Sequence, residues 1–328
     1  MFLLSLGILA IIAGLIWQQY RSFLSAPLTI ASEGFILQVA RGATVRSVIT
    51  DLAQQGYTVS DWRWRILNRL QSTTIRAGEY ALQSGITPPG LLDLLSSGAV
   101  IHYRFTIIEG WTFSQLKEAL AQNPVLNQQL ADLDGDTSIM AAINADIDHP
   151  EGWFLPETYQ YVRGDSDLDI LHRSHRAMQA ELELAWAAKN PDLPLASAFE
   201  LLTLASIVEK ESGLESERAE IAGVFVRRLK NNWRLETDPT VIYGLGKSYD
   251  GDIRRRDLDT DTPYNTYTRY GLPPTPIALP GKSALAAAAA PAEGTAMFFV
   301  ASGSGGHVFS DTLNEHNLAV RKMLRKQP

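Results

Sequence analysis

Residues 199–212 read FELLTLASIVEKES, and the interpretation of the whole chain starts from this stretch. Its apolar residues recur every three or four positions, which is the spacing of one face of an α-helix. The residues that form this apolar stripe are Leu201, Leu204, Ala205 and Val208. Ser197 and Glu200 make a capping-box pattern at its start. The sequence therefore predicts an amphipathic helix from about residue 199 to residue 212.

Two carboxylates, Glu209 and Glu211, lie near the end of this helix. At 100° per residue they point about 160° apart, so they cannot share one site and at most one faces a cleft. A glutamate in that position would lie beside apolar surface, which raises the pKa of a carboxyl group towards the value a general acid needs. The alternative is that both are ordinary glutamates of the helix surface, and helix geometry does not choose between the two.

Several sequence blocks, taken in their order along the chain, do distinguish a catalytic glutamate from two ordinary surface glutamates. LASIVEKE at 204–211 and IAGVF at 221–225 resemble the core of the YceG-like (MltG) family of endolytic murein lytic transglycosylases. Further matching blocks are EGWFLPETY at 151–159, RRL at 227–229, LETDPTVIYGLG at 235–246, YNTY at 264–267, GLPPTPIALPG at 271–281 and GGHVF at 305–309. The chain departs from the family pattern at Glu157, where aspartate is common, and at Glu236, where glutamine is common. Neither residue is expected to touch the proposed acid.

The resemblance implies that Glu211 is the catalytic residue, and Ser212 after it is similar to the Glu-Ser pair of lysozyme-like lytic transglycosylases. Glu211 would protonate the MurNAc–GlcNAc glycosidic oxygen and then deprotonate the C6 hydroxyl of MurNAc, leaving a 1,6-anhydro end. This implies a lyase that limits glycan strand length and uses no metal and no cofactor. The expected substrate contacts are Glu151, Ser212, Asp238, Tyr243, Tyr264, Asn265, Tyr267 and His307.

The sequence predicts an α+β protein with a small module at 35–99 and a larger catalytic domain at 100–328. In the module, a strand at 35–39, helices at 45–54 and 61–70 and a strand at 77–82 give a βααβ order that resembles a LysM module. Such modules often hold N-acetylated glycans. Ser60 is expected to open the second helix, and a further helix is expected from Thr87 to Gly98.

The larger domain is expected to contain the lysozyme-like catalytic helix and several flanking elements. Thr112 and Gln115 form a capping box for a helix at 113–121. The remaining expected elements are helices at 168–188 and 218–229, strands at 297–301 and 307–310, and a C-terminal helix. A polar connection follows residue 121, and loops are expected over 237–282.

The N-terminal residues 1–20 are predicted to be a transmembrane anchor, followed by a linker at 21–34. The apolar run FLLSLGILAIIAGLIW at 2–17 would measure roughly 24 Å as a helix, slightly short of a ~30 Å hydrocarbon core. Trp17 and Tyr20 suit a membrane interface. A cleaved signal peptide is the main alternative. With the anchor retained, the protein is expected in the inner membrane as a single-pass protein whose catalytic domain lies in the periplasm.

Composition excludes several functional classes. The net charge is −7, which disfavours a nucleic-acid partner. The chain has no cysteine, so it has no disulfides and no thiol nucleophile. The six histidines form no HExxH motif, and His172 and His175 are expected to be solvated.

Two other functions remain open. A catalytically inactive wall-binding scaffold would have the same fold, and Ser114 with Lys117 matches S-x-x-K, the nucleophile motif of penicillin-binding proteins. Neither K-T-G nor S-D-N accompanies that motif. The expected partners are peptidoglycan glycan strands and the inner membrane, with peptidoglycan synthases or other wall-assembly proteins as further candidates.

Overall fold

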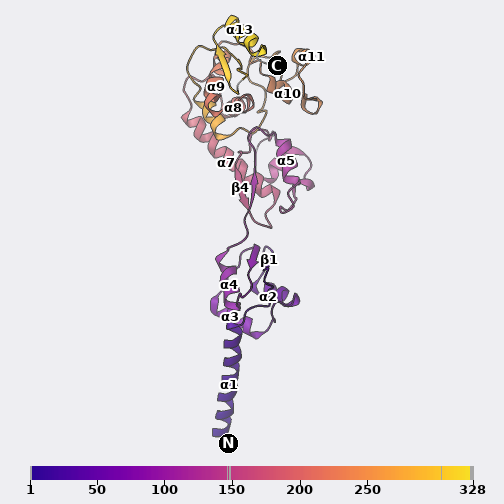
Figure 1. Cartoon of the computed structure of the whole chain (residues 1–328), viewed down its shortest axis with the longest axis vertical. Coiled ribbons are helices and arrows are strands. Elements are labelled where there is room, and N and C mark those ends of the chain that lie inside the picture. Colours follow the sequence, from indigo (N-terminus) through magenta and orange to yellow (C-terminus); the bar gives the residue numbers. More distant parts are fainter. Residues whose placement is uncertain (1, 146, 148, 304, 326–328) are drawn as a thin grey trace. The chain divides into compact units, whose positions relative to one another are not determined.

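The computed structural model describes residues 2–145, 147, 149–303 and 305–325 (Figure 1). Met1 of the predicted anchor and residues 326–328 of the predicted catalytic domain lie outside this range. The chain divides into two compact units. The first comprises Met1–Arg104, Val125–Asn127 and Gln160–Asp165, and the second comprises Phe105–Pro124, Gln128–Tyr159 and Ser166–Pro328.

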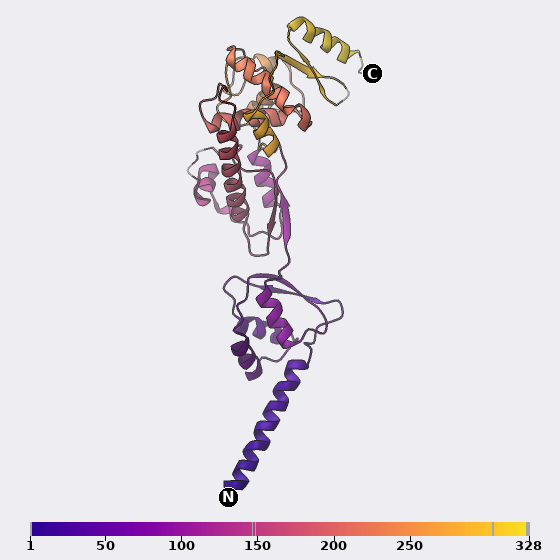
Figure 2. The same ribbon diagram turned by 90° about the vertical axis from the view of Figure 1, so that its left-hand side faces the viewer.

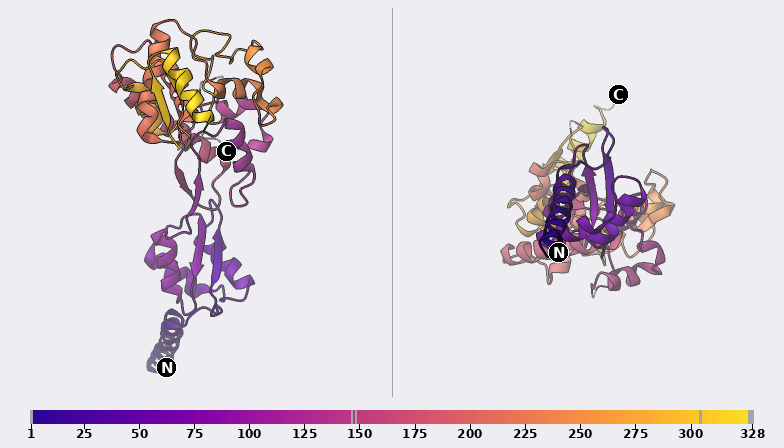
Figure 3. Two further views of the ribbon diagram at one scale, coloured as in Figure 1. Left: turned by 45° about the horizontal axis from the view of Figure 1, so that its top comes forward. Right: turned by 90° about the horizontal axis from the view of Figure 1, so that it is seen from below.

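The first unit contains the predicted βααβ order. Its elements after the N-terminal helix are β1 (Phe35–Val39), α2 (Val45–Gln54), α3 (Trp62–Gln71), β2 (Gly78–Leu82) and α4 (Pro88–Ser97). β1 and β2 pair antiparallel, with Phe35 opposite Leu82 and Val39 opposite Gly78 (Figure 3). Thr44 caps α2 in a capping box with Ser47. The cap of α3 is Asp61 rather than Ser60, because the Asp61 carboxylate accepts the N–H of Arg63 at 2.9 Å.

The N-terminal helix α1 (Phe2–Ser25) continues beyond the predicted anchor. Tyr20 and Phe23 are buried, and Tyr20 stacks on Trp62 with 6.3 Å between ring centroids. Leu28 and Ile30 also belong to the core of the first unit. Part of the segment expected as a linker therefore packs as core. Within the range that the structure describes, no helix is long and apolar enough to cross a membrane.

The second unit is built around one buried helix, α8 (Ala198–Glu211), which is the predicted central helix. It packs against α7 (Asp167–Ala188), α9 (Glu215–Lys230), α10 (Asp238–Leu245) and α12 (Lys282–Ala289) (Figure 1). The helix is buried on almost all sides between Leu201 and Glu209. The apolar stripe expected from the sequence is therefore only part of its buried surface.

The chain has further elements after α4. They are β3 (Tyr103–Thr106), α5 (Phe113–Ala121), η1 (Leu130–Asp132), α6 (Gly135–Ala142), β4 (Thr158–Tyr161), η2 (Gly246–Ser248), α11 (Arg255–Asp259), β5 (Phe298–Ala301), β6 (His307–Ser310) and α13 (Leu313–Leu324). Two of them, β3 and β4, continue from one unit into the other. β3 pairs with β4, and β5 pairs antiparallel with β6. α13 lies against the β5–β6 hairpin (Figure 2).

Three expectations about this unit are wrong. α6 lies in the segment expected as a polar connection, and α10 and α11 lie within the predicted loops. Pro239 occupies the first turn of α10, where a proline is tolerated because the N–H that it lacks would have no partner within the helix. His175 is buried rather than solvated, with its Nδ1 3.2 Å from the Trp153 carbonyl oxygen.

Candidate active site

Glu211 is the last residue of α8, at the point where the chain leaves the core. Ser197 caps the other end of the helix by accepting the N–H of Glu200 at 3.2 Å. After Glu211 the chain becomes extended at Ser212, which is buried and whose hydroxyl accepts the N–H of Leu214 at 3.0 Å. Ser212 thus shapes the exit from the helix and orients the residue before it.

The Glu211 side chain is half-buried, and its carboxylate accepts a short hydrogen bond from the hydroxyl of Thr237. Thr237 is itself fixed, because its N–H donates to the Thr266 hydroxyl at 3.0 Å. The hydroxyl oxygens of Thr266 and Thr240 are 2.9 Å apart. A buried threonine cluster therefore holds the Glu211 carboxylate in place.

Glu211 opens onto a cavity of about 450 Å³, which we call the acid cavity. It is lined by Glu211, Arg228, Leu235, Glu236, Asp238, Tyr267, Phe298, Phe299, Val300, Leu313 and His316. Of the predicted substrate contacts, Asp238 and Tyr267 lie here, and the Tyr267 hydroxyl donates to Asp238 Oδ1 at 2.6 Å. The walls combine apolar side chains with a few charged ones, as is usual for a ligand site.

Burial raises the pKa of the Glu211 carboxyl, and the negative charge of Asp238 acts in the same direction. The Thr237 hydrogen bond opposes the shift, because it stabilises the carboxylate. The net effect is a carboxyl group that holds its proton more strongly than a free glutamate does. A raised pKa favours the protonated form, which is the form that a general acid needs.

Glu209 has a different environment on the opposite flank of α8. It is buried, its Oε1 lies 2.7 Å from Nη2 of Arg218, and its Oε2 accepts the N–H of Gly281 at 2.9 Å. Lys210 between the two glutamates is exposed and donates to the Gly110 carbonyl at 3.1 Å. The prediction that the two glutamates occupy different sites is confirmed. The alternative that both are surface residues is wrong for Glu209.

Three further predicted contacts line a separate cavity of about 740 Å³, which we call the tyrosine cavity. Glu151 is buried there, and it accepts the Phe113 N–H at 2.9 Å and the Tyr243 hydroxyl at 3.1 Å. Burial raises the pKa of Glu151 to about 7. Tyr243 and Tyr264 pack edge to face with 4.9 Å between ring centroids. These residues are therefore not grouped with Glu211 in one cavity.

Two predicted contacts have hydrogen bonds that point to roles in the fold. Asn265 is buried, and its amide donates to the carbonyl oxygens of Leu258 and Thr260 at 3.0 and 2.7 Å. His307 lies in β6, with Nδ1 2.8 Å from the Glu217 carboxylate. Both side chains hold neighbouring segments together.

Sequence reasoning missed residues that contact or surround Glu211. Thr237 of the LETDPT block and Arg228 of the RRL block are not among the predicted contacts. The guanidinium of Arg228 is buried and donates to the Leu235 carbonyl at 2.7 Å. Glu236 lines the acid cavity with a left-handed backbone φ of 51°. Glu236 and Glu211 therefore line the same cavity, and the expectation that Glu236 does not touch the proposed acid stays a prediction.

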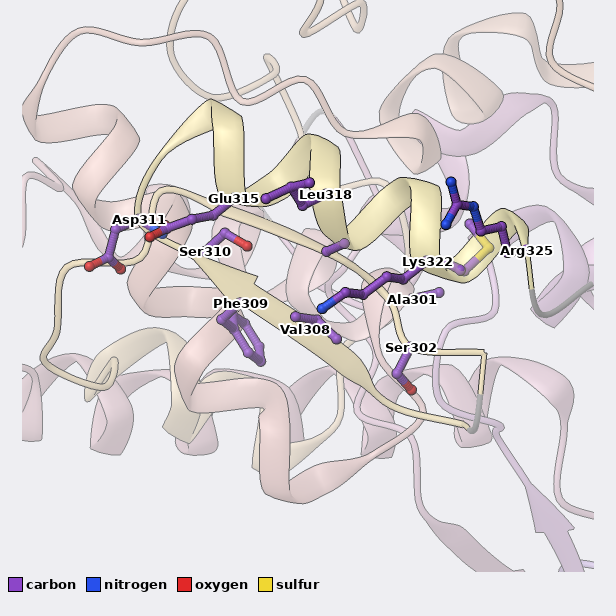
Figure 4. A pocket seen from close by; sticks show the side chains of 12 residues that line it. Ala301, Ser302, Val308, Phe309, Ser310, Asp311, Glu315, Leu318, Lys322 and Arg325 are labelled. Atoms are coloured by element: carbon purple, nitrogen blue, oxygen red, sulfur yellow. The ribbon is translucent and has the colours of Figure 1, made fainter.

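A third cavity, of about 730 Å³, lies between α13 and the β5–β6 hairpin (Figure 4). Val308, Glu315 and Lys322 are among the residues that line it, and none of the predicted site residues does. Across the residues described by the structure, no group of three or more His, Asp or Glu side chains could hold a metal ion. The expectation that no cofactor takes part stays a prediction.

Comparison with known proteins connects this geometry to a family. The model of the YceG-like family matches residues 37–322. The chain is 31% identical over 306 residues to the endolytic murein transglycosylase of Bacillus subtilis, covering 88% of this chain and 84% of that protein. It is 26% identical over 308 residues to the endolytic murein transglycosylase of Streptococcus pneumoniae, of which it spans 55%.

A solved structure is similar to this chain in fold. The crystal structure of a yceG-like protein from Listeria monocytogenes superposes with a TM-score of 0.56 at 28% sequence identity. The match covers 88% of this chain and 99% of the Listeria chain.

Proposed function

Because this chain belongs to the YceG-like family, we propose that it is an endolytic murein transglycosylase that cleaves peptidoglycan glycan strands. The observation that carries the proposal is the position of Glu211. Its carboxyl group lies at the end of a buried helix, opens onto a cavity, and has a raised pKa because of burial.

We propose that Glu211 acts first as the acid and then as the base. In its protonated form it gives a proton to the glycosidic oxygen between MurNAc and GlcNAc. The resulting carboxylate then takes the proton from the C6 hydroxyl of MurNAc as that oxygen attacks C1. The product has a 1,6-anhydro ring, and the proton taken from the C6 hydroxyl leaves Glu211 protonated for the next cycle. Because the substrate supplies the nucleophile, this reaction does not need the second carboxylate of an ordinary glycosidase.

The neighbours of Glu211 support this sequence of proton transfers. The Thr237 hydrogen bond orients the carboxylate and would stabilise it after the proton has left. Asp238, held by Tyr267, carries negative charge into the cavity where positive charge would develop on the sugar. We propose Asp238 and Tyr267 as substrate contacts, with Asn265 and Ser212 acting through the backbone that they position.

Product analysis tests this proposal. The full chain is incubated with purified sacculi or nascent glycan strands, and the new ends are identified by mass spectrometry. Internal cleavage to 1,6-anhydro-MurNAc ends supports the proposal. Reducing MurNAc ends would indicate hydrolysis, which the carboxylates of Glu236 and Asp238 in the same cavity make a specific alternative. Absence of any cleavage would favour a wall-binding scaffold.

We further propose that α1 anchors the chain in the inner membrane, with the second unit in the periplasm. The support is the exposed apolar surface of α1, because large exposed apolar patches mark contact with membranes or other proteins. Its exposed apolar side chains are Leu6, Ile8, Leu9, Ile11, Ile12, Leu15, Ile16 and Trp17. A reporter fused to the C-terminus that works only in the periplasm should be active, and a mature N-terminus near residue 26 would contradict the anchor.

For the LysM-like module we propose glycan positioning without chemistry. The support is a cavity of about 190 Å³ between α2 and α3, lined in part by the exposed side chains of Arg46 and Arg65 and by Asn68. Replacing both arginines by alanine should weaken binding to sacculi. Peptidoglycan synthases and other wall-assembly proteins remain candidate partners.

A further inference from the structure

The tyrosine cavity carries positive charge that the proposed glycosidic chemistry does not use. Three lysines line it. Lys117 is neutralised, since its Nζ lies 2.6 Å from Asp136 Oδ1. Lys210 donates to a backbone carbonyl, and Lys247 is exposed on η2. In the part of the chain that the structure covers, neither Lys210 nor Lys247 forms an ion pair.

The one buried carboxyl group of this cavity does not balance the two lysines. Both oxygens of Glu151 already accept hydrogen bonds, from the Phe113 N–H and from the Tyr243 hydroxyl. Its pKa of about 7 means that much of the population carries Glu151 uncharged at neutral pH. The cavity is therefore cationic within a chain whose formal net charge is −7. A cationic pocket in an acidic protein indicates an anionic ligand.

The rest of the lining narrows the class of ligand. Pro239, Ile242 and Ile277 add apolar surface, and Tyr243 and Tyr264 add aromatic rings with hydroxyl groups. Amino sugars of the glycan backbone are neutral, so they can accept hydrogen bonds from the two lysines but cannot balance their charge. A short peptide with small apolar side chains and free carboxylates matches both the apolar walls and the lysines.

The position of the cavity links such a peptide to the proposed reaction. Lys210 and Glu211 are consecutive residues of α8, and they line the tyrosine cavity and the acid cavity respectively. Helix α10 borders both, with Asp238 on the acid cavity and Tyr243 on the tyrosine cavity. In peptidoglycan the acidic peptide is attached to the lactyl group of MurNAc, the sugar whose C6 hydroxyl would attack.

Resting on the proposed function, we propose that the tyrosine cavity binds the acidic peptide stem of the MurNAc residue next to the cleaved bond. Lys210 and Lys247 meet the carboxylates of the stem, and the tyrosines contact its backbone and small side chains. The cavity thereby favours strands that still carry their peptides over strands from which an amidase has removed them.

The test compares two substrates with the full chain. kcat/KM is measured on uncrosslinked strands that carry stems and on the same strands stripped by an amidase. The wild type should prefer strands with stems. Replacing Lys210 and Lys247 together by glutamine should lower the ratio of the two kcat/KM values by roughly 3- to 30-fold, the range expected for losing charge-assisted contacts. Lys230→Gln, which makes the same charge change on the exposed end of α9, should leave the ratio unaltered.

The outcomes separate this inference from the proposed function. A wild-type ratio near one overturns the inference while the proposed function stands. The inference also fails if the double lysine variant loses activity equally on both substrates, because this indicates sugar binding or a folding defect, and thermal melting tells those apart. Cleavage of neither substrate by the wild type overturns the proposed function and this inference with it.

Discussion

Arg218 and Glu209 form an almost fully buried ion pair, with 2.7 Å between Nη2 and Oε1. The pair fastens α9 to the last turn of α8, and the second carboxylate oxygen of Glu209 accepts the Gly281 N–H. A Cβ at Gly281 would overlap the carboxylate of Glu109, so any larger residue there would require that half-exposed side chain to move. Since Glu211 lies two residues further along α8, these contacts fix the helix end that carries the proposed acid.

Glu209→Gln should therefore destabilise the fold. Removing the Glu209 charge leaves the buried Arg218 guanidinium with the half-exposed Glu109 as its ionic partner, so the loss should approach the roughly 3–5 kcal/mol typical of breaking a buried ion pair. Urea unfolding of the full chain measures this loss. Glu109→Gln is the matched control, because Glu109 also contacts Arg218, at 3.3 Å, but its side chain is 48% exposed. Glu109→Gln should lower the free energy of unfolding by less than about 1 kcal/mol. Equal losses for the two variants would contradict a structural role for the buried pair.

Thr237→Val should alter how Glu211 titrates. The Thr237 hydroxyl lowers the pKa of Glu211, so removing it should raise that pKa further. The limb of the pH–rate profile that reports Glu211 should then move to higher pH, and turnover should fall by roughly 10-fold, as expected when a hydrogen bond to a charged group is lost. Thr237→Ser keeps the hydroxyl and should restore both values. A profile unchanged in Thr237→Val would contradict the proposed contact.

Glu151 should make stability depend on pH in a defined direction. Its folded-state pKa of about 7 exceeds its unfolded value near 4.5. Its contribution is therefore fully present below about pH 4.5 and is lost as pH rises through 7, by an amount on the order of 3 kcal/mol. Glu151→Gln removes this titration. Between pH 5 and pH 8 the wild type should lose unfolding free energy relative to Glu151→Gln. A difference that is constant over this range would contradict the raised pKa.

Elements with local signals could be predicted from the sequence. The capping box of Thr112 and Gln115 and the Thr87-Pro88-Pro89 start of α4 depend on residues a few positions apart, and both are present in the structure. α10 was not predicted, because Tyr243, Gly244 and Gly246 in and after its second half are typical of loops, although Pro239 in its first turn is compatible with a helix start. The burial of His175 depends on Trp153, 22 residues away in the chain, so the charged residues near it were misleading.

The candidate site likewise combines features that local sequence signals predict with features that depend on tertiary contacts. Helical periodicity placed Glu209 and Glu211 on different flanks, but it carried no information about which one was paired. That depends on Arg218 and on the N–H of Gly281, which is 72 residues away. The grouping of Tyr243 and Tyr264 with Glu151, in a cavity separate from Glu211, likewise follows from tertiary packing and not from spacing along the chain.

The central claim is that Glu211 alone carries the proton transfers. Glu211→Gln keeps the side chain's shape and its ability to accept the Thr237 hydrogen bond, but it cannot donate and recover a proton. The most direct measurement is the rate of 1,6-anhydro-muropeptide release from purified sacculi by this variant, with thermal melting run in parallel. Glu220→Gln, with the same charge change at an exposed position of α9, is the control. The single-glutamate mechanism predicts a fall of at least ~10²–10⁴-fold for Glu211→Gln with little change in melting temperature, and near wild-type release for the control. Release by a folded Glu211→Gln variant at the wild-type rate would contradict it.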